Sequence, residues 1–113
     1  MGEKGGNPGS KGRIFRMMII KIHKAEKRNI VSICDENLVG KKFYDKDLQL
    51  DVSESFYKGQ NLSEEETLEV LRGADSLNIV GKDSVKFALK NELIDETNII
   101  RIKKIPYAIA ILK

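Results

Sequence analysis

The chain contains a single cysteine, a single histidine and two prolines, and it has no tryptophan. One cysteine excludes an internal disulfide framework, as is usual for proteins of a reducing cytoplasm. Because a zinc ion takes at least three protein ligands, His23 and Cys34 cannot form a histidine–cysteine zinc site by themselves. The sequence therefore predicts no metal and no other cofactor.

Long apolar segments are absent as well. No stretch approaches the roughly 20 apolar residues that a membrane-spanning helix needs, and the first residues lack the apolar centre of a secretory signal peptide. The 113 residues are 41% hydrophobic and 33% charged, which is typical of one soluble domain with a charged surface. We expect a cytoplasmic protein with no membrane partner.

The net positive charge lies entirely in the first sixteen residues. The chain has 20 basic and 17 acidic residues, a formal charge of +3, whereas residues 17–113 hold equal numbers of each sign. Residues 1–16, called the leader here, contain five of the nine glycines and four cations, Lys4, Lys11, Arg13 and Arg16. This composition predicts a flexible basic tail that suits a polyanion such as RNA. Alternatively, the leader is an upstream start or a cloning remnant, because Met17 and Met18 offer natural starts.

Residues 17–113 are predicted to form one globular domain with several short strands. Residues 17–23 and 29–34 are rich in isoleucine and valine and flank a charged stretch, which is typical of a β-hairpin. Neither face of the second strand is polar throughout, so we expect that strand inside a sheet. Further strands are predicted at residues 41–44, 48–52, 76–80, 99–102 and 107–112. The last is apolar on both faces and is expected to be central.

The clearest predicted helix follows Ser63. Ser63 and Glu66 have the spacing of a capping box, in which each side chain accepts a hydrogen bond from the other residue's backbone N–H. Leu68 and Leu71 would share one face, and Gly73 would end the helix.

A second helix is predicted after a turn at Gly81, with Asp83 as its N-cap. Val85, Ala88 and Leu89 have the spacing of one apolar stripe. Asp35 is expected to cap a single helical turn over residues 35–40. Together these elements predict an α+β fold, a mixed and mostly antiparallel sheet of five or six short strands with two helices packed against it.

Two sites for chemistry are considered, and for each we favour the structural alternative. The Gly81 turn enters a helix, so its backbone N–H groups would hold an anion, with Lys82 adjacent; the alternative is a glycine needed only for the turn. His23 and Cys34 would face each other across the first hairpin as base and nucleophile, provided that a nearby charge activates the thiol. The alternative is a small buried cysteine at a strand end.

The charge of residues 17–113 is distributed unevenly. Residues 17–44 hold six basic and three acidic residues, residues 45–75 hold three and nine, and residues 76–113 hold seven and four. If the two basic segments meet in space, they form a basic patch without the leader. The alternative is an ordinary mixed, solvated surface.

Several segments together resemble an archaeal family known as domain of unknown function 424. The segments are MMIIKIHK, VSICDENLVGKKF, LQLDVSESFYKG, LSEEETLEVL, NIVGKDSVKFALKNELI and IPYA, in that order along residues 17–113. The resemblance excludes the leader. It implies an archaeal cytoplasmic protein of α+β fold with a suspected place in the translation apparatus, and no established activity or catalytic residues.

These observations favour a non-enzymatic accessory of the archaeal translation machinery. Its partners would be ribosomal RNA or ribosomal proteins, contacted by the basic tail and the folded body, and no DNA specificity is expected. One alternative is a small enzyme or ligand-binding protein that uses the Cys34–Asp35 turn or the Gly81 turn. Another is a self-associating module.

Overall fold

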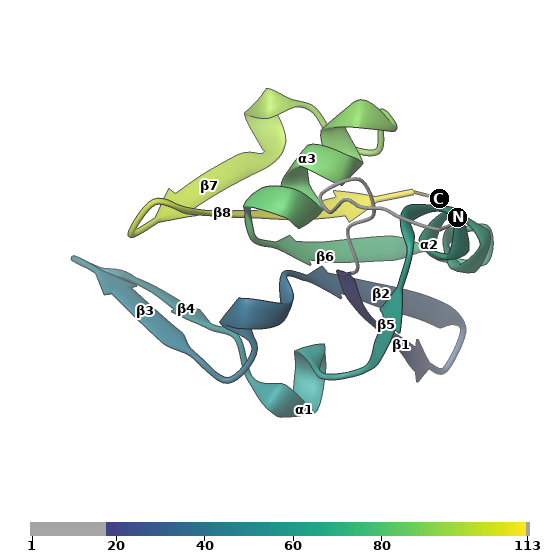
Figure 1. The fold of residues 1–113 in the computed structure, drawn as a ribbon, viewed down its shortest axis with the longest axis horizontal. Helices are drawn as coiled ribbons and strands as arrows, with labels where there is room; N and C mark the ends of the chain where they lie inside the picture. The colour runs from purple at the N-terminus through teal and green to yellow at the C-terminus, as the bar shows by residue number, and fades with distance from the viewer. Residues whose placement is uncertain (1–17, 113) are drawn as a thin grey trace, which may run out of the picture.

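The computed structural model describes residues 18–112, and a six-stranded sheet forms their centre (Figure 1). Neighbouring strands are antiparallel except β2 and β6, which run parallel. Two further strands, β3 (Lys42–Asp45) and β4 (Leu48–Asp51), form a separate hairpin. In spatial order, the strands of the main sheet are β5 (Gln60–Leu62), β1 (Met18–Ala25), β2 (Arg28–Cys34), β6 (Ser76–Val80), β8 (Ile105–Ile111) and β7 (Ile99–Ile102). The predicted α+β class and its mixed, mostly antiparallel sheet are confirmed.

Three α-helices and two 3-10 turns connect these strands: α1 (Glu54–Tyr57), α2 (Glu64–Leu71), α3 (Lys82–Lys90), η1 (Glu36–Leu38) and η2 (Glu96–Asn98). The capping box of α2 is confirmed, because Ser63 Oγ accepts from the Glu66 N–H at 3.2 Å and the Glu66 carboxylate accepts from the Ser63 N–H at 2.9 Å. Leu71 faces the core as predicted. Leu68 does not, since 39% of it is exposed; Thr67 is buried in its place.

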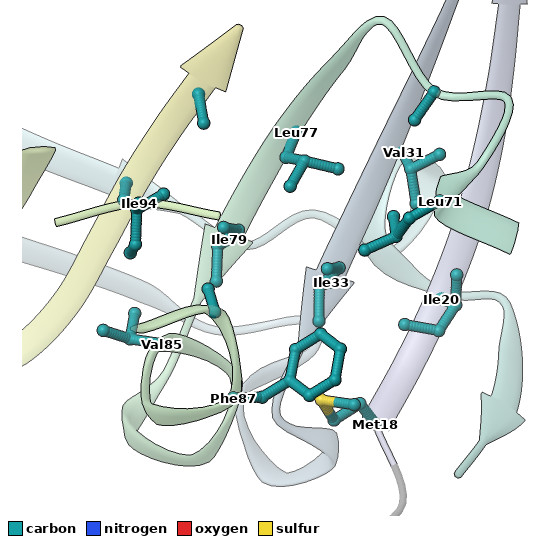
Figure 2. Packing of buried hydrophobic residues seen from close by; sticks show 14 residues of the cluster. Met18, Ile20, Val31, Ile33, Leu71, Leu77, Ile79, Val85, Phe87 and Ile94 are labelled. Atoms are coloured by element: carbon teal, nitrogen blue, oxygen red, sulfur yellow. The ribbon is translucent and has the colours of Figure 1, made fainter. Parts of the chain in front are cut away.

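The larger core lies between α3 and the face of the sheet that it covers. Figure 2 shows Phe87 pointing from α3 toward Met18 and Ile33, and only 1% of Phe87 is exposed. Leu71 of α2 extends this core along β1 and β2. The predicted stripe of α3 is confirmed, because Val85 and Ala88 are buried and Leu89 packs partly against the same cluster.

A second, smaller core lies on the opposite face of the sheet. It joins Cys34 and Val80, at the ends of β2 and β6, to residues of η1, β4 and α1. As predicted, β2 and β8 lie inside the sheet, but the second face of β8 is covered only in part. On that face Ile105 and Tyr107 pack partly against the smaller core, whereas Ile109 and Ile111 are 51% and 65% exposed. The apolar pattern of β8 therefore predicted its internal position in the sheet correctly, but it did not predict whether both of its faces are buried.

The hairpin turns are shorter than the sequence suggests. Ala25 pairs with Arg28, and Ile102 pairs with Ile105, so each of these hairpins closes through two residues. Both strands of the first hairpin extend into the charged stretch that was predicted as a long turn. Across residues 18–112, no helix combines the length and apolar character needed to cross a membrane.

Candidate functional site

The ends of the parallel strands β2 and β6 bring Asp35 and Gly81 into contact. Asp35 follows β2, and Gly81 follows β6 and precedes α3. The Asp35 carboxylate accepts hydrogen bonds from the backbone N–H of Asp83 at 3.1 Å and of Ser84 at 2.8 Å, and from the Ser84 hydroxyl at 2.7 Å. Asp35 therefore caps α3 from a distant part of the chain, and does not cap its own turn η1, where no side-chain cap is formed.

This contact depends on the missing side chain at position 81. The φ angle of Gly81 is +109°, a conformation that favours glycine. A Cβ atom at Gly81 would lie 2.3 Å from Cγ of Asp35. The predicted N-cap of α3 is therefore corrected, because the N-cap position is Gly81 and the capping carboxylate is that of Asp35, not Asp83.

The same contact occupies the turn that the sequence proposed for anion binding at Gly81 and Lys82. The backbone donors of Asp83 and Ser84, which would face such an anion, already have a carboxylate partner. An external anion at this turn would have to displace Asp35.

Cys34 is fully buried beside this turn. Burial, with a smaller contribution from the neighbouring Asp35 carboxylate, raises the pKa of its thiol to about 12. At neutral pH the thiol stays protonated, whereas the thiolate is the nucleophile. These surroundings are those of a packed cysteine.

The alternative of a buried cysteine is confirmed, because His23 and Cys34 do not face each other as a catalytic pair would. His23 pairs with Ile30 across the hairpin, and Cys34 pairs with Ile19. The His23 ring stacks on Phe56 with centroids 4.1 Å apart, and its Nε2 donates to the Phe56 carbonyl at 2.8 Å. The histidine thus holds the end of α1 against β1.

We expect Cys34 to react with iodoacetamide at least about a hundredfold more slowly in the native protein than in the unfolded chain at pH 8, because the thiol is both inaccessible and protonated. Mass spectrometry of timed samples, with and without denaturant, measures the two rates. Equal rates would contradict the buried, unactivated thiol and would restore the enzyme hypothesis for this turn.

A basic groove lies between α3 and the β7–β8 hairpin. Its volume is about 250 Å³, and among residues 18–112 no acidic residue lines it. Lys82 and Lys86 stand one turn apart on α3, and Arg101 and Lys104 face them from the hairpin. The floor is apolar, formed by Val85, Leu89 and Pro106.

The groove cations are exposed and mostly unpaired. Within residues 18–112, Lys82, Lys86 and Lys104 form no salt bridge, and Arg101 has one partner, Glu96, at 3.7 Å. The hairpin residues 99–111 contain three basic residues and no acidic one. A positive potential therefore collects in the groove, since nothing in its walls neutralises the lysines.

The sequence identified only part of this surface. Lys82 was singled out and does line the groove, whereas Lys86, Arg101 and Lys104 were missed. Two features of the sequence could have identified them: the basic excess of residues 76–113, and the adjacent Lys103 and Lys104 between two predicted strands. The leader cations Lys4, Lys11, Arg13 and Arg16 lie outside the described residues.

Comparison with known proteins agrees with the family that the sequence resembles. Residues 23–112 match the model of a family described as protein of unknown function, DUF424. A crystal structure of an uncharacterized conserved protein from Methanopyrus kandleri has the same fold, with a TM-score of 0.70 and 19% identity over 86% of this chain and 94% of that chain. No curated protein matches.

Proposed function

This chain belongs to the DUF424 family of proteins of unknown function, and we propose that it is a cytoplasmic, non-enzymatic accessory of the archaeal translation machinery. In this proposal it binds RNA within a ribosome or another RNA–protein assembly. The groove between α3 and the β7–β8 hairpin carries the proposal, because it gathers four cations from two elements and no acidic residue of the described range lines it.

The groove has the composition expected of a phosphate-binding surface. Lysine and arginine contacts to phosphates supply most of the sequence-independent affinity for nucleic acids. The lysines of the groove are exposed, so a phosphate backbone meets them without rearrangement of the core. Phosphate contacts position a protein on its partner and carry no sequence information, which suits an accessory of a large assembly.

The leader would add to this surface. Lys4, Lys11, Arg13 and Arg16 are four cations among glycines with a single acidic residue nearby. Segments of this composition bind polyanions by neutralising phosphates and releasing counterions. Leader and groove are predicted to act additively.

The alternative of an enzyme or small-ligand protein has less support. Its two candidate positions are the Cys34–Asp35 turn and the Gly81 turn. The thiol of Cys34 is buried with a raised pKa, and the carboxylate of Asp35 is engaged in three hydrogen bonds within the chain.

Sedimentation with archaeal ribosomal subunits over a series of salt concentrations tests the proposal. Replacing Lys82, Lys86 and Lys104 together by glutamine is expected to weaken binding most at low salt, and to flatten the slope of log K against log [salt] by about 2 to 3 units, near 0.9 for each lost phosphate contact. Removing the leader is expected to flatten it by about 2 to 4 units for the same reason.

A control variant separates the groove from net charge alone. Lys24, Lys27 and Arg28 are also exposed cations, but they lie at the β1–β2 turn, far from the β7–β8 turn (Figure 1). Replacing these three by glutamine removes the same charge and is expected to change the slope by less than about 1 unit. Equal losses in both triple variants would show that net charge acts without a site. No sedimentation of the full chain would refute the proposal.

A further inference from the structure

The turn between β7 and β8 places two lysines in an unfavourable backbone conformation. Ile102 pairs with Ile105, so Lys103 and Lys104 alone form the turn. Their φ angles are +53° and +69°. Two-residue hairpin turns with positive φ at both positions strongly prefer asparagine and glycine, because a Cβ atom is strained in the left-handed region.

Nothing within the described chain explains lysine at these positions. Both side chains are exposed, and neither forms a salt bridge with another residue of 18–112. The turn would be more stable with Asn–Gly, so the two positive charges are present at a loss of stability. Positive φ angles also occur at Glu26 and Lys46, in the turns of the other two hairpins, so strain alone does not mark a binding role. This turn differs in that both of its residues have positive φ and are basic, and in that Lys104 lines the groove.

The turn continues the basic groove. Lys104 lines the groove together with Lys82 and Lys86, and Lys103 is its neighbour in the same turn. Figure 1 shows that the β7–β8 hairpin extends beyond the end of α3. The cations of α3 and those of the projecting turn therefore form one extended surface, in which Lys104 belongs to both the groove and the turn.

The aromatic residues argue against a single-stranded ligand. Proteins that bind single strands stack bases on exposed aromatic side chains, but no aromatic residue among 18–112 lines the groove. In this range Phe87 and Tyr57 are buried, Phe56 stacks on His23, and Phe43 and Tyr107 pack partly against the smaller core. The exposed aromatic residue of this range is Tyr44, on the separate β3–β4 hairpin.

We infer that this surface binds double-stranded RNA, with Lys82 and Lys86 of α3 on one sugar-phosphate strand and the turn lysines Lys103 and Lys104 on the strand across the RNA groove. The inference rests on the RNA-binding function proposed above and names its substrate class. Duplex RNA is recognised mainly through its shape and its phosphates, which a lysine-lined surface without stacking residues fits.

Binding of the full chain to a 20-base-pair RNA duplex of mixed sequence and to each of its single strands, measured by fluorescence anisotropy, tests this inference. The duplex is expected to bind at least about fivefold more tightly than either strand, since its phosphates are denser and lie on two backbones. Replacing the turn by Asn–Gly (Lys103→Asn with Lys104→Gly) is expected to weaken duplex binding about tenfold and to raise the melting temperature by about 4 °C.

The Asn–Gly variant keeps the hairpin, so weaker binding cannot be ascribed to unfolding. As a matched control, Lys103→Arg with Lys104→Arg retains both charges and the strained turn, and is expected to bind the duplex like the native chain. Equal or tighter binding of the single strands would overturn the inference while leaving RNA binding intact. Unchanged duplex affinity in the Asn–Gly variant would overturn it too. Failure to bind duplex, strands and ribosomal subunits alike would refute the proposed function itself.

Discussion

Gly81→Ala is expected to lower the free energy of unfolding by about 4 kcal/mol, because it combines left-handed backbone strain with loss of a buried cap. The φ angle of +109° is unfavourable for alanine. The added Cβ would lie 2.3 Å from the Asp35 carboxylate carbon and would force that side chain away from α3. Urea denaturation followed by circular dichroism measures the change.

Gly73→Ala is the matched control for this substitution. Gly73 ends the region of α2, and a Cβ atom there meets nothing within 4 Å. The control is expected to alter the free energy of unfolding by less than about 0.5 kcal/mol. A similar loss at both positions would mean that Gly81 is needed only as a flexible residue, without the close approach of Asp35.

Asp35→Ala is expected to cost about 3 kcal/mol, because it removes a helix cap and leaves a buried hydroxyl without its acceptor. The carboxylate serves two backbone donors of α3 and the hydroxyl of Ser84, which is fully buried. Asp35→Asn retains an acceptor oxygen at the same place and is expected to lose only about 1 kcal/mol. Thermal and urea unfolding of the two variants measure the difference, and equal losses would contradict a capping role.

The two substitutions are expected to be coupled. Because alanine at position 81 already displaces the Asp35 carboxylate, the double variant Asp35→Ala with Gly81→Ala should be more stable than the sum of the single losses predicts, by about 1 to 2 kcal/mol. If the two losses of stability were additive, the effects of Asp35→Ala and Gly81→Ala would be independent, which would contradict a contact between these positions.

This cap also connects the family-like segments to the basic groove. Asp35 belongs to CDENLVG and Gly81 to NIVG, and their contact fixes the first turn of α3. Lys82 lies in that turn, and Lys86 follows one turn later. The segments that carry the family resemblance therefore contain two of the four groove cations, Lys82 and Lys86, and fix the helix turn from which these project.

Local patterns were sufficient where partners lie close in sequence. The capping box of Ser63 and Glu66 joins residues three apart, and the stripe of Val85 and Ala88 depends on helical spacing alone. Both were predicted and are present. The prediction for Leu68 was wrong because the buried face of α2 contains Thr67 and Leu71. Which face of a helix is buried depends on how the helix packs against the sheet, and the helix sequence alone does not specify this.

The register of the strands and the contacts between distant residues could not be predicted from local sequence patterns. His23 and Cys34 lie at opposite ends of the first hairpin, because His23 is beside the turn and pairs with Ile30, whereas Cys34 ends the second strand and pairs with Ile19. The Asp35 cap was missed because its donors lie nearly fifty residues later, beyond any local capping rule.

By itself, the sequence determined the α+β class, the internal positions of β2 and β8, the capping box of Ser63 and Glu66, and the basic excess of residues 76–113, since each depends on composition or on neighbours along the chain. Only the tertiary structure decided that Asp35 caps α3, that Cys34 is inert beside it, and that Lys82, Lys86, Arg101 and Lys104 share one groove. The parallel pairing of β2 with β6 and the folding of the hairpin beside α3 bring these residues together. Such contacts are set by the packing of whole elements, because the residues that meet are separated by many others along the chain.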